Sequence, residues 1–502
     1  MSRRLPDELK IAKEAGISVG GGASGGFLRY LFNILVARLH GVEILGMYAI
    51  TNAFFQIGAR IAALGLESGL VRYVARLMAR DQKDVAVATV RKATLLGFIS
   101  GIVVSWLLHR YADDIVSRWF PASMGQLPQL IRWFALSIPF TLIARMAAAA
   151  SQGLKVLKHR VLALSILPML ILAVGLVLLS VWYDPIDAIG MAYFASQVVS
   201  MMAALLFLMP LLPVHHRQDV PSESGLLRFS LPLLGASVVV AALNWSDLLM
   251  LGSMINDRTA GLYQPALRTA TMLPVIANAF TAILAPLVSE HQATNNLPQI
   301  KRLLKLTTLW TFIFLWPLLL LILLYGSKIM LIFGSDFLQS AVALRLLALA
   351  TFSISITLGL AAVVTMTGHP RFVLFNSVLA LSVNIGLNLV LIPRYGLMGA
   401  AISTGTASLL IALLRIVQTW RLFHISPFSF RMLRPAVAGA AGWLACLAIN
   451  SLIFGLHTVA VLILGGLLFM LVYLFVLWRL GMTEEEINVM NAAVRKIRRA
   501  RN

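Results

Sequence analysis

Basic residues occur in every second gap between the apolar segments of this chain, and the other gaps hold few Lys or Arg. When the apolar segments are counted as membrane crossings, one side carries 28 Lys and Arg and the other side carries six. Cytoplasmic loops of membrane proteins keep such an excess of positive charge, and no soluble fold requires it. The pattern therefore predicts a multi-pass protein of the inner cell membrane with both termini in the cytoplasm.

The composition supports the same prediction. Of the 502 residues, 59% are hydrophobic and 12% are charged, whereas soluble proteins have about 45–50% and about 25%. One crossing needs about 20 mostly apolar residues, so the sequence predicts an all-α polytopic membrane protein with about 14 transmembrane helices. The expected crossings are residues 17–39, 43–66, 90–109, 129–151, 161–182, 188–212, 229–252, 260–287, 305–325, 341–366, 372–392, 397–418, 434–454 and 458–479.

A weak internal repeat divides the chain. Gly46-Met47-Tyr48 is echoed 215 residues later by Gly261-Leu262-Tyr263, and further matches follow in the same order. Such repeats are typical of transporters in which two bundles enclose a binding site near the bilayer midplane. We therefore expect a cytoplasmic N-terminal segment, an N-terminal six-helix lobe, a cytoplasmic linker, a C-terminal six-helix lobe of parallel orientation, two additional helices and a basic amphipathic cytoplasmic tail on the membrane lipids. Their expected bounds are 1–16, 17–212, 213–228, 229–420, 421–480 and 481–502.

Motifs of nucleotide hydrolysis and zinc chemistry are missing. The chain has neither a G-x-x-x-x-G-K-[ST] phosphate-binding loop nor an H-E-x-x-H motif, and its one cysteine, Cys446, has no partner for a disulfide bond. The net charge of +21 is spread over short loops instead of gathering on one domain, which favours membrane topology over nucleic-acid binding as its cause. The sequence thus predicts a protein that is not an enzyme, needs no cofactor and binds no nucleic acid.

Several arginines lie inside the predicted crossings. A charge at the bilayer centre costs about 2.5–3.5 kcal/mol on insertion scales, so such residues normally face water or a partner. The candidates for a water-filled lumen are Arg29, Arg60, Arg145 and Arg268. Three arginines nearer to the ends of their crossings are expected to reach the interface or to pair with helix-end carbonyls, namely Arg38, Arg345 and Arg415. For Arg145 both roles remain open.

Polar residues accompany two of these arginines at helical spacing. Asn52, Gln56 and Arg60 recur every four residues and so share one face of a helix. The crossing at 260–287 repeats the arrangement with Gln264, Arg268 and Asn278, and it contains Pro274 as an expected kink. We expect these amides to meet the polar part of a ligand.

Essentially one carboxylate, Asp247, lies within the predicted crossings, in the segment Asn244-Trp245-Ser246-Asp247. It is expected to pair with Arg268 or Arg29, or to form a proton or cation site, and the sequence does not separate these. The lumen would remain net positive. Because the planar fork of arginine matches phosphate geometry, such a lumen favours a phosphate or pyrophosphate head group as ligand.

These features together resemble the Wzx-type polysaccharide flippases of the multidrug/oligosaccharidyl-lipid/polysaccharide exporter superfamily. The resemblance covers nearly the whole chain and depends on the span count, the parallel repeat, the paired glycine and tyrosine motifs, Arg228-Phe229-Ser230-Leu231-Pro232 and Asn244-Trp245-Ser246-Asp247. It implies a V-shaped transporter with two lobes. Such a transporter moves a polyprenyl-pyrophosphate-linked oligosaccharide to the outer leaflet by alternating access, for cell-surface polysaccharide biosynthesis.

The same resemblance suggests partners and alternatives. A lipid-linked oligosaccharide is the expected substrate, and a polysaccharide polymerase and glycosyltransferases of the same pathway are possible partners. Three other functions are left open: a drug or cation antiporter of the same superfamily, a peptidoglycan-precursor flippase and, with the least support, a membrane glycan polymerase. The expected ligand contacts are Arg29, Arg60 and Arg268 to pyrophosphate and Asn52, Gln56, Gln264 and Asn278 to sugar hydroxyls.

Overall fold

The computed structural model describes residues 7–121, 125–212, 225–453 and 457–481, and these ranges contain helices and no strands. Within them, 13 helical segments are long and apolar enough to cross a membrane. The first of these, Gly20–Ala62, is 43 residues long, about twice the length that one crossing needs. An all-α membrane fold with about 14 transmembrane helices is therefore confirmed. The expected tail at 482–502 and most of the linker at 213–228 lie outside the described residues.

Helix α1 (Asp7–Ala62) contains two predicted crossings separated by a reversal at Gly41. Gly41 has φ 84° and ψ −172°, a combination that is open to glycine and strained for other residues. The turn lies between the predicted crossings at 17–39 and 43–66, as the sequence indicates. Helix α1 begins at Asp7, ten residues before the predicted start of the first crossing.

The remaining helices of the first half pack into one bundle. Helix α5 contacts α3 and α8, and α8 contacts α7. We call α1 to α8 the N-lobe. Its further elements are α2 (Leu66–Ala79), α3 (Lys83–Arg110), α4 (Ala112–Trp119), α5 (Leu127–Gly153), α6 (Leu157–Val161), η2 (Leu162–Ile166), α7 (Leu167–Leu179) and α8 (Pro185–Leu208), followed by the short η3 (Met209–Leu211).

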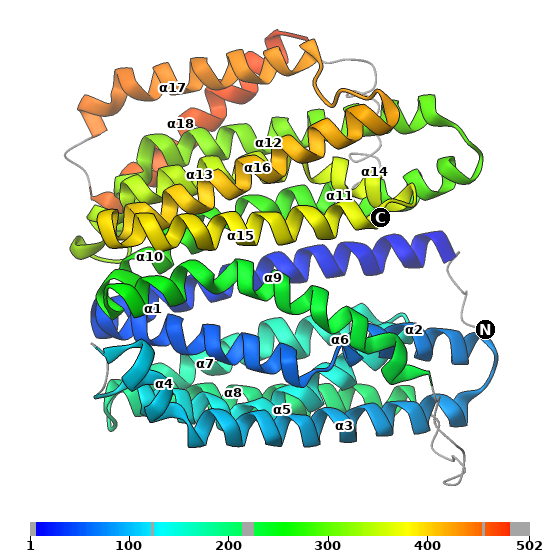
Figure 1. Cartoon of the computed structure of the whole chain (residues 1–502). Helices are drawn as coiled ribbons and strands as arrows, with labels where there is room; N and C mark the ends of the chain where they lie inside the picture. Colours follow the sequence, from blue (N-terminus) through cyan, green and yellow to red (C-terminus); the bar gives the residue numbers. More distant parts are fainter. Residues whose placement is uncertain (1–6, 122–124, 213–224, 454–456, 482–502) are drawn as a thin grey trace, which may run out of the picture.

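The second half forms a bundle of corresponding size, in which α11 contacts α12, α13 contacts α16, and α15 contacts both α9 and α16. We call α9 to α16 the C-lobe. Its elements are α9 (Leu226–Met254), α10 (Asp257–Ala270), α11 (Leu273–Ala293), α12 (Leu297–Leu331), η4 (Ser335–Ser340), α13 (Ala341–Ile356), α14 (Leu358–Met366), α15 (Pro370–Tyr395) and α16 (Leu397–Phe423). In Figure 1 the two lobes form separate layers, with the first half of α1 and helix α9 between them.

Two further helices, α17 (Leu433–Ile453) and α18 (Thr458–Arg479), lie at the outer edge of the C-lobe after the short η5 (Phe430–Met432). They contact each other and α12. The single cysteine, Cys446, is fully buried in this pair, with its Sγ 3.5 Å from the carbonyl oxygen of Gly465. This arrangement agrees with the prediction that the last two crossings stand outside the repeat.

The lobes meet where the repeated glycines lie. A Cβ atom on Gly46 would touch the carbonyl oxygen of Asp257, and a Cβ atom on Gly261 would touch that of Val42. Asp257 lies four residues before Gly261 on α10, and Val42 lies four residues before Gly46 on α1. Each glycine therefore packs against the turn that precedes the other glycine, and the crossing of α1 and α10 is reciprocal. Small residues allow helix backbones to approach this closely. The repeated motif therefore marks a contact between the two halves.

A second contact lies at the start of α2, close to the basic loop that follows it. Gly65 has φ 70°, which glycine adopts without strain. A side chain there would touch the carbonyl oxygen of Ser230 on α9, and one on Gly69 would touch the Ser230 hydroxyl. The lobes are thus joined at two glycine contacts on α1, α2, α9 and α10, and the space between these contacts holds the candidate site.

Candidate functional site

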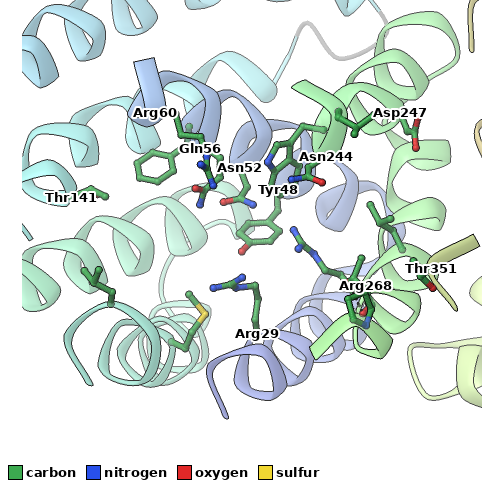
Figure 2. Close-up of a pocket in the computed structure, with 18 of the residues that line it drawn as sticks. Arg29, Tyr48, Asn52, Gln56, Arg60, Thr141, Asn244, Asp247, Arg268 and Thr351 are labelled. Atoms are coloured by element: carbon green, nitrogen blue, oxygen red, sulfur yellow. Dashed lines mark hydrogen bonds between the residues drawn. The ribbon is translucent and has the colours of Figure 1, made fainter. Parts of the chain in front are cut away.

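A cavity of about 770 Å³ lies between the lobes. Helices α1, α5 and α8 supply much of its N-lobe wall, with further residues from α2, α6 and α7, and α9, α10, α15 and α16 supply much of its C-lobe wall. Seven of the nine residues predicted from the sequence line it: Arg29, Asn52, Gln56, Arg60, Arg145, Asp247 and Arg268. Figure 2 labels all of these residues except Arg145.

One arginine from each lobe approaches the centre of the cavity. Arg29 of α1 and Arg268 of α10 converge beside the ring of Tyr48 (Figure 2). The Arg268 guanidinium also lies over the Trp245 ring, 5.0 Å from its centroid, close enough for cation–π attraction. Among the described residues neither arginine has an ion-pair partner. The two lobes therefore present a pair of uncompensated positive charges to the same space.

The position of Arg268 follows from a break in its helix. Helix α10 ends at Ala270, and α11 begins at Leu273 with Pro274 in its first turn. Proline is tolerated at that position because its missing N–H would be unpaired in any case. Arg268 thus lies in the last turn of α10, where the helix dipole favours a cation. The predicted kink at Pro274 is present as an interruption between two helices.

This interruption also explains why two predicted residues lie outside the cavity lining. Asn278 is exposed on α11, because the helical phase counted from Arg268 is lost at the break. Gln264 is fully buried where α10 crosses α1, and its Nε2 donates to the Oδ1 of Asn33 at 3.3 Å. The structure therefore does not bring these two amides together with the other predicted site residues.

The N-lobe wall carries a second group of charges near the end of α1. Arg145 Nη1 lies 3.5 Å from Glu67 Oε1, and Arg160 Nη2 lies 4.0 Å from Glu67 Oε2. Arg145 also donates to Gln56 Oε1 at 3.2 Å. The charge on Arg60 interacts with those of Arg145 and Glu67. We call Arg60, Arg145, Arg160 and Glu67 the N-lobe charge cluster.

The local sequence explains this cluster. Asn52, Gln56 and Arg60 all line the cavity from one face of α1, as their spacing predicts. Helix α1 ends at Ala62, and the left-handed residues Leu64 (φ 50°) and Gly65 (φ 70°) turn the chain into α2. That turn brings the carboxylate of Glu67 in the first turn of α2 next to α5 and α6.

Asp247 on the C-lobe wall has partners of a different kind. Its carboxylate accepts hydrogen bonds from the Tyr263 hydroxyl at 2.8 Å, from Asn384 Nδ2 at 2.9 Å, from Asn388 Nδ2 at 2.7 Å and from the Thr404 hydroxyl. Within the described part of the chain no arginine pairs with it. The expected pairing with Arg268 or Arg29 is thus absent there. Asn384 and Asn388 instead bond helix α15 to α9 through this carboxylate.

Asp247 and its four partners form a largely buried polar cluster in which Asp247 is the one carboxylate. The Asp247 side chain is 6% exposed, and its carboxylate, amide and hydroxyl neighbours are the oxygen groups that hard cations use as ligands. No group of three His, Cys, Asp or Glu able to hold a metal ion occurs among the described residues. The cluster can therefore hold a negative charge with neutral donors, or accept a proton or a hard cation.

The arginines expected to have structural roles do bind helix carbonyls. Arg38 donates from Nε to the carbonyl oxygen of Ile332 at 2.7 Å and from Nη2 to that of Leu331 at 2.8 Å, at the end of α12. Arg345 donates to Leu323 and Arg415 to Ile354 in the same manner, at 3.0 Å and 3.1 Å. Arg38 and Arg415 thus bind carbonyls at the end of a helix, one of the two expected roles, whereas the acceptor for Arg345 lies inside α12. Arg29, Arg60 and Arg268 differ in having no such bond to a described residue.

Sequence reasoning missed several polar residues of the lining. Thr141 lies one turn before Arg145 on α5 and donates to Gln197 of α8 at 3.0 Å, and its four-residue spacing from Arg145 was a usable signal. Trp245 lies in the segment Asn244-Trp245-Ser246-Asp247, in which the sequence analysis predicted a site role only for Asp247. Thr271, three residues after Arg268, was readable from the same polar spacing. Other residues of the lining gave no distinct signal: Tyr48, Gln197, Ser200, Thr351, Thr404 and Ser408.

Comparison with known proteins agrees with these observations. The family model described as "Polysaccharide biosynthesis protein" matches residues 11–292. A curated relative, the probable low-salt glycan biosynthesis flippase Agl15 of Haloferax volcanii, is 24% identical over 162 residues. That alignment covers 32% of this chain and 34% of the relative, so the chain matches about a third of the relative's length.

Solved structures share the whole fold at low identity. The lipid II flippase MurJ in an inward closed conformation has a TM-score of 0.74 and 14% identity, covering 91% of this chain and 96% of that one. An inward-facing multidrug resistance MATE family transporter has a TM-score of 0.69 and 15% identity, covering 80% and 94%. A transporter from Pyrococcus furiosus with a binding pocket of reversed polarity has a TM-score of 0.60 and 14% identity, and the match covers 83% of this chain and 95% of that one.

The family match extends over more than half of the chain, from α1 to the end of α11. It agrees with the resemblance found in the sequence. The chain therefore belongs to the polysaccharide biosynthesis protein family and has the fold of the multidrug/oligosaccharidyl-lipid/polysaccharide exporter superfamily.

Proposed function

We propose that this protein is a flippase that moves a polyprenyl-pyrophosphate-linked oligosaccharide from the cytoplasmic to the outer leaflet. The observation that carries the proposal is the pair Arg29 and Arg268, which face one cavity from two lobes without a described counter-charge. The family description and the flippase relative support a lipid-linked glycan as the substrate. Both termini would lie in the cytoplasm.

Electrostatics favours an anionic head group in this position. An unpaired guanidinium at membrane depth is costly, and an anion that enters the cavity offsets that cost. Pyrophosphate offers several oxygens to the planar donor forks of two arginines, and charge-assisted bonds of this kind are about twice as strong as neutral ones. A cationic drug would be repelled by the same charges. The basic half of the cavity therefore favours a lipid pyrophosphate over a cationic substrate.

The remaining parts of the substrate have corresponding surroundings. Asn52 and Gln56 on α1, and Asn244 on α9, offer amides to sugar hydroxyls along the cavity wall. The polyprenyl tail would stay in the lipid and pass between the lobes. In this proposal Gln264 and Asn278 have no substrate contact, because neither lines the cavity.

The two glycine contacts between the lobes support alternating access. Backbone meets backbone at Gly46 and Gly261, and Gly65 and Gly69 meet Ser230 on the side of the basic loops. Helix α2 also packs on α9 through the rings of Tyr73 and Phe229, whose centroids are 6.0 Å apart. In this proposal the two contacts open in turn as the lobes move. A head group bound by both Arg29 and Arg268 would link its own binding to the relative position of the lobes.

Asp247 supports an ion-coupled cycle. Its buried carboxylate lines the cavity and has neutral donors from α10, α15 and α16, so binding of a proton or a cation would change the bonds that join these helices. This observation also keeps cation antiport as the second candidate function. Loss of an antiporter would sensitise cells to cationic compounds and leave glycan export intact.

The test is flipping by the full chain in proteoliposomes that contain a polyprenyl-pyrophosphate oligosaccharide. Arg29→Ala and Arg268→Ala should each slow transport by about tenfold or more, the cost of one charge-assisted bond. Arg371→Ala, which removes an exposed arginine at the start of α15, is the control and should transport at the normal rate. Undiminished transport by both lumenal variants would overturn the assignment of the head-group site.

A further inference from the structure

The N-lobe charge cluster carries more positive charge than it neutralises. Three guanidinium groups, those of Arg60, Arg145 and Arg160, line the cavity with one carboxylate, that of Glu67. Its members lie on α1, α2, α5 and α6, all within the N-lobe. The cluster therefore has two positive charges in excess, apart from the central pair Arg29 and Arg268.

The ion pairs inside the cluster are long. The nitrogen–oxygen separations of 3.5 Å and 4.0 Å from Glu67 to Arg145 and Arg160 exceed the 2.7–2.9 Å of a well-formed charge-assisted bond, a typical range for such pairs. Both arginines are held by neutral amides instead. Arg160 Nη1 donates to Gln152 Oε1 at 2.6 Å, and Arg145 Nη2 donates to Gln56 Oε1 at 3.2 Å. The cations are thus positioned by other groups, and the carboxylate between them is loosely bound.

These charges are also partly removed from water. The side chains of Arg145, Glu67 and Arg160 are 17%, 27% and 37% exposed. Excess charge that is fixed and partly desolvated attracts an anion more strongly than the same charge on an open surface. The cluster is therefore prepared to accept a second anionic group.

We propose that the N-lobe charge cluster binds a carboxylate on the glycan, so that the substrate class is an acidic oligosaccharide that contains a uronic or related sugar acid. This inference rests on the proposed function and specifies its substrate. Glu67 marks where a carboxylate lies between Arg145 and Arg160. A sugar carboxylate would bind those guanidinium groups together with that of Arg60, which forms no hydrogen bond or ion pair with a described residue.

The spacing along α1 separates this site from the pyrophosphate site. Tyr48 lies beside Arg29 and Arg268, and Arg60 follows twelve residues later on the same helix. At 1.5 Å per residue this is a rise of about 18 Å. A single pyrophosphate cannot reach both groups, whereas a short oligosaccharide can. The amides of Asn52 and Gln56 lie between the two sites and face the cavity.

The experiment compares two substrates in proteoliposomes containing the full chain. One is a polyprenyl-pyrophosphate oligosaccharide with a uronic acid, and the other is the same lipid with that carboxylate reduced to an alcohol. The acidic lipid should be flipped about tenfold faster at subsaturating concentration, as expected for one additional charge-assisted bond. Equal rates for the two lipids would overturn the inference and leave the proposed function intact. Transport of neither lipid would overturn both.

Variants identify the residues by the ratio of the two rates, which does not depend on the amount of folded protein. Arg145→Gln and Arg160→Gln should reduce the acidic-to-neutral ratio from about ten toward one. Glu67→Gln should raise it, because a competing carboxylate is removed. Arg371→Gln is the matched control for the loss of one positive charge and should keep the original ratio. A ratio unchanged in both cluster variants would contradict the assignment.

Discussion

The two walls of the cavity use charge in opposite ways. On the N-lobe wall, three arginines share one loosely held carboxylate, at 3.5 Å and 4.0 Å from two of them. On the C-lobe wall, the carboxylate of Asp247 is held by hydroxyl and amide donors from three helices. The first wall leaves charge for a ligand to neutralise. The second wall stabilises its own charge with neutral groups.

The repeated motif shows how this difference arises within one architecture. Tyr48 and Tyr263 occupy equivalent places, two residues after glycines that cross reciprocally. Both rings are buried, but Tyr48 lines the cavity beside two arginines, whereas Tyr263 donates to Asp247. Tyrosines at equivalent positions thus have different partners in the two halves.

The largest effect is expected where the two walls meet. Arg268→Glu replaces an attraction for pyrophosphate with a repulsion, so flipping should fall by about 100-fold or more, corresponding to the loss of about 3 kcal/mol of binding. Arg268→Lys keeps the charge without the planar fork and should lose less. Initial rates in proteoliposomes measure both. Equal activity of the glutamate and lysine variants would contradict an anionic head group at this position.

The next largest effect is expected at the contact between Gly46 and Gly261, where matched substitutions test whether the two lobes pack equivalently. Gly46→Val and Gly261→Val each force a side chain against a backbone carbonyl of the opposite lobe. Each should lower the free energy of unfolding by about 1–3 kcal/mol, the usual cost of overpacking. Thermal unfolding in detergent measures it, with Gly386→Ala, where nothing lies within 4 Å, as control. A large difference between the two valine variants would break the symmetry of the contact.

The two carboxylates give a direct comparison of the walls. Asp247→Asn keeps one acceptor oxygen and replaces the other with an NH2 group. Either the two amide donors or the two hydroxyl donors then lose a carboxylate acceptor, at a cost of about 1–3 kcal/mol. Glu67→Gln removes only long, partly exposed ion pairs, worth less than about 1 kcal/mol. Chemical or thermal unfolding of both variants tests the order. The contrast between the walls fails if Glu67→Gln is the more damaging change.

The smallest effect is expected for the exposed ion pair between Arg258 and Glu43, which links the lobes, whereas Asp336, the second partner of Arg258, belongs to the C-lobe. Arg258 lies 3.9 Å from Glu43 and 3.8 Å from Asp336, and the side chains are 47–67% exposed. Such pairs contribute about 0–1 kcal/mol in water. Glu43→Gln should therefore change flipping by less than about twofold, with a smaller change at high salt. A strong, salt-sensitive loss of transport would show that this surface, too, depends on charge.

Helix number, the face formed by Asn52, Gln56 and Arg60, and the turn at Gly41 follow from local pattern, and the structure agrees with them. Pro274 indicated a kink but not that the helix stops at Ala270 and loses its phase, and so Asn278 was placed on the wrong face. The partners of Asp247 could not be foreseen, because they come from residues up to 157 positions away. Periodicity specifies a face of one helix, whereas contacts between distant helices depend on how the bundle closes.

Cys446 has a practical consequence for observing the motion of the lobes. It is the one cysteine in the chain, and it is fully buried between α17 and α18. The natural protein thus has no accessible thiol to react with a probe. Pairs of cysteines introduced on the two lobes could therefore carry spin labels or fluorophores while Cys446 is left in place, and the distance between the labels would report the opening and closing of the lobes.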